Sequence, residues 1–237
     1  MTEIQTGVIN PIEIFKEAWT IIKDDFWLLF AISLLGMIIG GVSMYILLGA
    51  MMCGIYYCFL KKIDGEKVNL EDLWKGFGFI VPSLLVTILI VVPMLLMLGI
   101  IYAPVILAIV MGSKLSSDEL TGLFLGAVAV DVVVAVVMTC LHTLLIFTFP
   151  LIVDKNLGAW ESITTSAKGV WRNIGGIAGM IGVMVIISIP LSMITCGLGV
   201  YLLLPIMLGG YALAYRKIFP KFNRNFNPPP PDIYQNF

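Results

Sequence analysis

Residues 76–113 read GFGFIVPSLLVTILIVVPMLLMLGIIYAPVILAIVMGS and contain no charged side chain. A helix needs about 20 apolar residues to cross the hydrocarbon core of a bilayer, so this stretch is long enough to span it. Residues 26–60 and 173–215 also lack charge, and Asp131 is the one charged residue in 120–153. These stretches predict an all-α fold, that of a polytopic helical membrane protein.

The composition excludes an ordinary soluble domain. Of the 237 residues, 59% are apolar and 12% are charged, whereas soluble domains carry roughly 25% charged residues. The formal net charge of -1 gives no overall field that attracts nucleic acid, so we expect no such partner. The four cysteines lie in apolar stretches without a CxxC pair, and there is one histidine, so we expect no disulfide framework, metal site or cofactor. The first residues lack a basic segment followed by an apolar core, which predicts no cleavable signal peptide.

Two of the apolar stretches predict helical hairpins. Lysines flank residues 26–60 on both sides, and a single helix of that length would reach ~52 Å, so an even number of crossings fits better. Its turn is expected near Gly40, Gly41 and Ser43. The same argument predicts a second hairpin between Arg172 and Arg216. Its turn is expected near Cys196, Gly197 and Gly199.

The two middle stretches, residues 76–113 and 120–153, give six crossings in total if each forms one long helix. Thirteen of the fourteen Lys and Arg residues then lie on the side of both termini, and Lys114 lies on the other. This asymmetry predicts cytoplasmic termini in the cell inner membrane. An eight-span alternative folds the middle stretches into hairpins near residues 93–104 and near Asp131, and charge counting leaves it open.

Two segments resemble each other and predict an internal repeat. NPIEIFKEAWTIIKDDFW starts at Asn10, and GAWESITTSAKGVWRNIG starts at Gly158. Superposing Glu13 on Glu161 aligns two amphipathic helices, which we expect to lie in the cytoplasmic interface. Asn10 suits the N-cap of the first, with Pro11 at its first helical position and Glu13 placed for a capping box. The apolar faces would comprise Ile12, Phe15, Trp19, Ile22 and Phe26 in the first helix, and Trp160, Ile163, Ala167, Val170 and Ile174 in the second, opposite Lys168 and Arg172.

The two predicted hairpins also end alike. YILLGAMMCGIYYCFLKK from Tyr45 matches YLLLPIMLGGYALAYRK from Tyr201, so that Gly54 falls on Gly210. The repeat units therefore cover about residues 10–62 and 158–217 of a single membrane domain, residues 1–222. Both units start from the cytoplasmic side, which predicts a parallel repeat about the membrane normal.

The run FPLIVDKNLGAWESITTSAKGVWRN, residues 149–173, resembles the membrane domain that precedes the catalytic domain in some bacterial glycerophosphodiester phosphodiesterases. It is also similar to related uncharacterised membrane proteins that stand alone. The matching positions are Pro150, Asp154, Gly158, Glu161 and Ser166. GEKVNLEDLWKGF, residues 65–77, resembles the loop after the first hairpin of that family. The resemblance implies a fold and a membrane setting without an activity, because the catalytic barrel has no counterpart here.

Asp131 and His142 are the ionisable residues inside the central apolar stretches. Eleven residues make about three helical turns, so the two side chains share a helix face. With Thr139 and Thr143 they form a candidate polar path for a proton or an ion. The alternative is structural: Asp131 is solvated at the outer membrane interface, and His142 makes a hydrogen bond to a neighbouring helix.

Basic residues follow both hairpins and are candidates for contact with anionic lipid headgroups. They are Lys61, Lys62, Arg216, Lys217, Lys221 and Arg224. Their alternative role is to mark the cytoplasmic side of the membrane. Residues 223–237 form a Pro-rich cytoplasmic tail, which either docks a protein partner or is a disordered end.

The sequence therefore predicts a non-enzymatic membrane protein, a scaffold or accessory subunit that organises lipid or a protein complex. No nucleophile with its base and no phosphate-binding loop is recognisable. The alternative is a transporter of a small solute, ion or lipid with a path near Asp131 and His142. A membrane-embedded enzyme ranks third.

Overall fold

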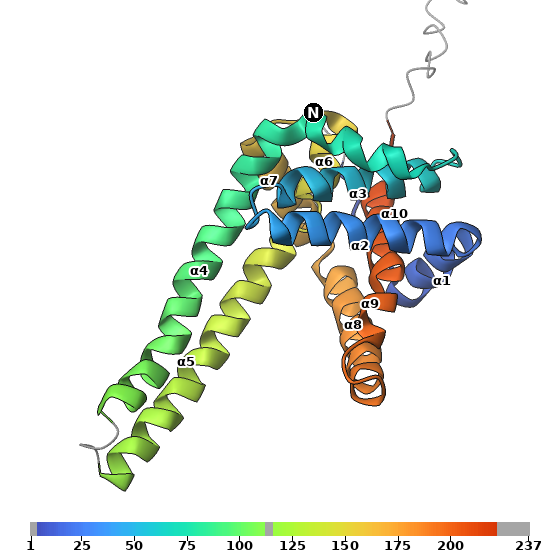
Figure 1. Cartoon of the computed structure of the whole chain (residues 1–237). Helices are drawn as coiled ribbons and strands as arrows, with labels where there is room; N and C mark the ends of the chain where they lie inside the picture. Colours follow the sequence, from blue (N-terminus) through green and yellow to red (C-terminus); the bar gives the residue numbers. More distant parts are fainter. Residues whose placement is uncertain (1–3, 112–115, 222–237) are drawn as a thin grey trace, which may run out of the picture.

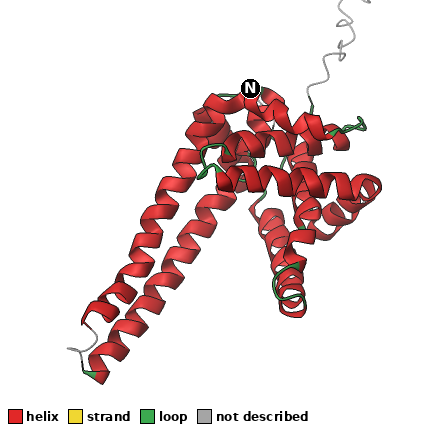
Figure 2. Cartoon of the chain, in the orientation of Figure 1, coloured by secondary structure: helices red, strands yellow, loops and turns green. Residues whose placement is uncertain are grey.

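The computed structural model describes residues 4–111 and 116–221, and every regular element in these ranges is a helix (Figure 2). The predicted all-α class is therefore confirmed. The elements are α1 (Pro11–Ile22), η1 (Lys23–Asp25), α2 (Phe26–Val42), α3 (Leu48–Ile63), η2 (Leu70–Phe79), α4 (Ile80–Met111), α5 (Ser117–Leu144), α6 (Thr148–Lys155), α7 (Ala159–Arg172), α8 (Ile174–Ile194), α9 (Gly199–Leu202) and α10 (Leu204–Ile218).

Among the residues that the structure describes, five helical segments are long and apolar enough to cross a membrane, which agrees with a multi-pass membrane protein. They are Pro11–Val42, Leu70–Val110, Ser117–Lys155, Ile174–Ile194 and Gly199–Ile218. The helix expected to make a further crossing, α3, has 16 residues and rises about 24 Å, short of the ~30 Å core. The predicted total of six crossings therefore stays a prediction.

The middle stretches form two long antiparallel helices, α4 and α5, which run side by side away from the body (Figure 1). α4 continues through Pro93 and Pro104, and α5 continues past Asp131. The eight-span alternative is therefore wrong, because neither place holds a turn. Each proline removes one backbone hydrogen bond, a loss that membrane helices tolerate.

The helix expected over residues 120–153 is broken at 145–147, between α5 and α6. A side chain from α7 enters the break. The Ser166 hydroxyl donates to the carbonyl oxygen of Leu144 at 2.7 Å and accepts from the N–H of Phe147 at 3.1 Å. An inserted side chain of this kind interrupts the helical ladder. Pro150, four residues after Ile146, has no N–H to offer the Ile146 carbonyl.

Both predicted hairpin turns are confirmed, at residues 43–47 and 195–198. In the first, the left-handed positions are Met44 (φ 51) and Tyr45 (φ 67) instead of the neighbouring glycines. The Ser43 hydroxyl stabilises this turn by donating to the carbonyl oxygen of Gly40 at 2.9 Å and accepting from the N–H of Leu47 at 3.0 Å. In the second turn, Gly197 has φ 89.

The core lies where α1, α3, α6 and α10 meet. α1 begins at Pro11 with Asn10 as N-cap, as expected, although the Asn10 side chain makes no capping bond. Its predicted apolar face is divided, because Phe15 and Ile22 are buried while Ile12 and Trp19 are exposed. The buried face of α1 instead comprises Ile14, Phe15, Ala18 and Ile22.

α7 packs on the body with small residues, and its predicted apolar face is divided, because Val170 is buried while Trp160 and Ile174 are exposed. Ser162, Ser166 and Gly169 are buried, and a Cβ on Gly169 would lie 2.5 Å from Cζ of Phe219. Small residues allow helices to approach closely inside a membrane protein. Trp160 and Trp171, by contrast, are 72% and 73% exposed.

Two helical hairpins, α4–α5 and α8–α10, extend from the body and diverge, while α2 and α3 lie across it (Figure 1). Both predicted repeat units share the order helix, helix, turn, helix, with η1 added in the first unit and the short α9 added in the second. Other atoms approach the aligned glycines Gly54 and Gly210 closely. A Cβ added to Gly54 would lie 2.0 Å from the carbonyl oxygen of Leu73, and one added to Gly210 would lie 2.4 Å from Cε1 of Phe15. The symmetry that relates the units stays a prediction.

Candidate functional site

An ionic cluster joins the last turns of α3, α6 and α10. Arg216 donates from Nε to Oδ1 of Asp64 at 3.1 Å and from Nη2 to Oδ2 at 2.8 Å, and its Nη1 lies 2.6 Å from Oδ1 of Asp154. The Tyr215 hydroxyl donates to Asp154 at 2.7 Å. Lys221 lies 2.6 Å from Asp64. The guanidinium thus binds two carboxylates from different helices, and the Arg216 side chain is 11% exposed.

A second cluster surrounds Asp72 at the start of η2. Its carboxylate pairs with Lys61 at 2.8 Å and with Lys75 at 3.2 Å, and it accepts from the N–H of Asn69 at 3.0 Å. Asn69 and Asp72 together form a capping box. Lys75 also donates to the Tyr57 hydroxyl at 3.2 Å. This cluster fixes η2 on α3.

The predicted headgroup cations that the structure describes all pair with carboxylates. The pairs are Lys61 with Asp72, Lys62 with Asp25, Arg216 with Asp64 and Asp154, Lys217 with Glu17, and Lys221 with Asp64. A lipid phosphate would have to compete with these carboxylates. Their contact with headgroups stays a prediction, and Arg224 and the tail of residues 223–237 lie outside the described residues.

The predicted polar path lies entirely on α5, and its two ionisable residues stay apart. Asp131 is partly buried, and its Oδ1 has no hydrogen-bond partner among the described residues. His142 is exposed, with Nδ1 2.8 Å from the carbonyl oxygen of Met138. About 16 Å of helical rise separates the two residues, and the positions between them on that face are apolar, Val134 and Met138.

Thr139 and Thr143 hydrogen-bond within α5. The Thr139 hydroxyl donates to the carbonyl oxygen of Ala135 at 2.8 Å, and the Thr143 hydroxyl donates to that of Thr139 at 2.7 Å. Bonds to the preceding turn satisfy a hydroxyl inside an apolar helix. His142 and the two threonines therefore come together, and Asp131 does not join them.

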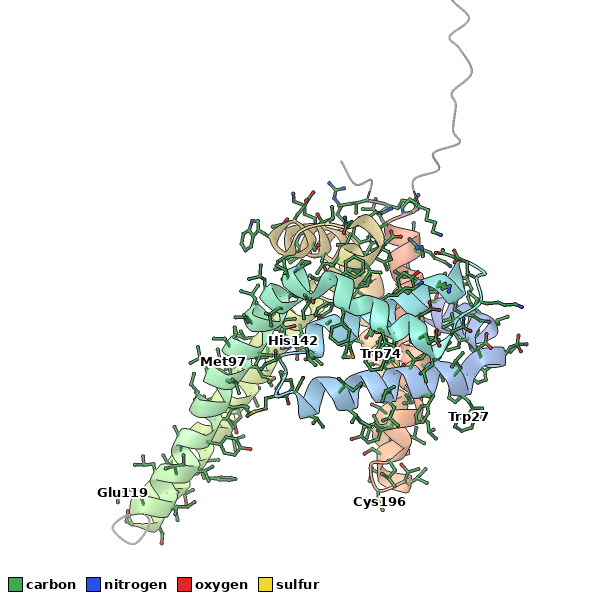
Figure 3. All side chains as sticks on the ribbon, turned by 45° about the horizontal axis from the view of Figure 1, so that its top comes forward. Trp27, Trp74, Met97, Glu119, His142 and Cys196 are labelled. Atoms are coloured by element: carbon green, nitrogen blue, oxygen red, sulfur yellow. The ribbon has the colours of Figure 1, made fainter. Side chains whose placement is uncertain are left out.

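His142 lies at the base of the α4–α5 hairpin, while Glu119 lies at its tip and Cys196 at the tip of the other hairpin (Figure 3). Grooves open on both sides of His142. The first groove, about 390 Å³, runs between α5 and the α8–α10 hairpin and is lined by Met138, Thr139, His142, Thr143, Ile146, Ile181 and Tyr211.

The second groove, about 330 Å³, lies between α4, α5 and α7 and has almost entirely apolar walls. It is lined by Leu89, Ile90, Pro93, Met138, Leu141, His142, Leu144, Leu145, Trp160, Ile163 and Ala167. A third hollow of about 330 Å³ adjoins it along α7 and is lined by Leu144, Ala167, Lys168, Trp171 and Arg172. Leu144 and Ala167 belong to both, so the two hollows form one continuous surface, which we call the α7 groove.

Sequence reasoning placed Lys168 and Arg172 on the polar side of α7 and did not select them as a site. The available signal was their spacing of one helical turn beside two tryptophans that are eleven positions apart. What the sequence did not show is that other basic residues are engaged by carboxylates.

Within the described part of the chain, no three His, Cys, Asp or Glu side chains gather in a way that suits a metal ion. No protein family, curated protein or solved structure matches this chain.

Proposed function

We propose that this chain is a non-enzymatic scaffold or accessory subunit of the cell inner membrane, and that it organises lipid or a membrane protein complex. The observation that carries the proposal is the second groove, which lies beside α5 where the hairpin leaves the body and has almost entirely apolar walls. Acyl chains and the apolar side chains of membrane helices fit such surfaces, because neither leaves a polar group unsatisfied.

The ionic clusters support a structural role for the charged residues. Asp64, Asp154 and Arg216 tie three helix ends together, and Asp72 ties η2 to α3. The resemblance of residues 149–173 to the membrane domain of glycerophosphodiester phosphodiesterases also supports a role in the membrane. Of those motif residues, Asp154 and Ser166 make contacts that hold the fold.

The grooves can be tested by filling one of them. Native mass spectrometry of the full chain, purified in mild detergent, should show retained lipid. Leu141→Trp places a large side chain in the second groove and should lower the amount of lipid per protein. Leu125→Trp is the matched control, since Leu125 lies on an exposed part of α5 away from the groove. Equal lipid retention by both variants, or none by the wild type, would contradict the proposal.

A second candidate function is transport, which one observation favours. The buried Oδ1 of Asp131 has no partner among the described residues, and acids inside membrane helices are often functional. On the scaffold proposal, Asp131→Asn folds normally and leaves lipid retention unchanged. Loss of a proton-coupled flux in vesicles with this monodisperse variant would replace the scaffold with a transporter.

A further inference from the structure

Lys168 and Arg172 lie one helical turn apart on the exposed polar edge of α7. Both are exposed, and neither takes part in the ion pairs found among residues 4–111 and 116–221. Glu161 shares this edge but lies two turns from Lys168, about 10.5 Å along the axis. The edge therefore carries a net positive charge that is open to an anion.

The two cations border an apolar slot. Together with Trp171 they line the third hollow, which is continuous with the second groove through Leu144 and Ala167. A phospholipid has the same arrangement of chemistry, because its phosphate lies directly above its acyl chains. Neither a soluble anion nor an uncharged lipid matches both the cationic rim and the apolar slot.

Trp160 and Trp171 indicate how deep in the membrane this site lies. They lie on one face of α7, and both side chains are largely exposed. Tryptophans gather at the level of the lipid headgroups, where one part of the ring system is apolar and the N–H is wet. Lys168 and Arg172 lie beside them on the helix and thus at the depth of a phosphate.

We propose that the α7 groove binds one anionic phospholipid of the surrounding bilayer. Lys168 Nζ and the Arg172 guanidinium hold its phosphate, and an acyl chain lies in the slot between α4, α5 and α7. This inference rests on the proposed function and names the class of lipid. It also assigns the headgroup contact to residues other than the paired cations at the ends of α3 and α10.

The experiment measures lipid selectivity with the full chain. The protein is reconstituted into vesicles of equal parts phosphatidylglycerol and phosphatidylcholine, extracted in mild detergent, and the ratio of bound lipids is measured by native mass spectrometry. The wild type should prefer phosphatidylglycerol. Lys168→Gln with Arg172→Gln should reduce this preference by roughly fivefold for each charge removed.

Lys16→Gln with Lys23→Gln is the matched control, because both lysines are exposed and their substitution removes the same charge from α1 and η1. This control should keep the preference for phosphatidylglycerol. Equal loss in both double variants would show general surface attraction and overturn the site, as would full retention by the α7 variant. In all of these outcomes the total amount of bound lipid stays the same and only the ratio of the two lipids can change. If the proposed function is wrong, the protein retains no lipid at all.

Discussion

The hydroxyl of Ser166 on α7 bridges the break between α5 and α6 by bonding two of the backbone groups there, the carbonyl of Leu144 and the N–H of Phe147. Ser166 and Phe147 are both buried, so water cannot take over these bonds. One hydroxyl thereby fixes α7 against the base of the long hairpin.

Ser166→Ala should destabilise the protein by about 1–3 kcal/mol, because it leaves the buried N–H of Phe147 without a partner. The measurement is the thermal unfolding midpoint in detergent. Ser188→Ala on α8 is the control, since that hydroxyl bonds within its own helix. An equal shift in both variants would refute a special role for Ser166.

Arg216→Met should destabilise the protein by less than the ~3–5 kcal/mol expected for an uncompensated buried charge, because Asp64 and Asp154 lose the guanidinium but keep Lys221 and Lys155 beside them. Adding Asp64→Asn and Asp154→Asn to Arg216→Met should recover part of the loss. Chemical unfolding monitored by tryptophan fluorescence measures both effects. Lys67→Met, at an exposed loop position, should change little. A triple variant less stable than Arg216→Met would contradict this account.

Gly54→Ala should disturb the contact of α3 with η2, since the added methyl would meet the carbonyl oxygen of Leu73 at 2.0 Å. Overpacking of this kind costs about 1–3 kcal/mol. Gly41→Ala has open space around it and serves as the control. Unfolding midpoints in detergent compare the two, and an undisturbed Gly54→Ala protein would count against the close packing.

The tip of the α4–α5 hairpin should lie on the opposite side of the membrane from the end of the chain. α4 has 32 residues, a rise of about 48 Å, which exceeds the ~30 Å hydrocarbon core. Cysteines introduced at Ser116 and at Asn225 in a cysteine-free background should react with an impermeant thiol reagent from opposite sides. Labelling from the same side would refute the predicted topology.

The local features of the fold could be predicted from the sequence, and the long-range contacts could not. The start of α1 at Pro11 and both hairpin turns follow from nearby residues and were correctly placed. The break at residues 145–147 depends on Ser166, which lies 19 positions from Phe147. No local pattern contains that bond, although the missing N–H of Pro150 was a partial signal.

Long-range contacts also decide which basic residues are ion-paired and which are not. Arg216 and Asp64 are 152 positions apart, so no periodicity in the sequence could reveal their pairing. The left-handed conformations of Met44 and Tyr45 were also missed, because glycines stood close by and are the usual residues for such positions.

The exposed length of the α4–α5 hairpin should make the protein sensitive to membrane thickness. Between residues 91 and 110, every side chain of α4 is at least partly exposed, and the hairpin is anchored to the body at one end (Figure 1). A hydrophobic segment longer than the bilayer core tilts to keep its apolar surface covered. A thinner bilayer should therefore increase the tilt of the hairpin. This tilt would place mechanical stress on the end of the hairpin that contacts the body, where Ser166 of α7 holds the end of α5.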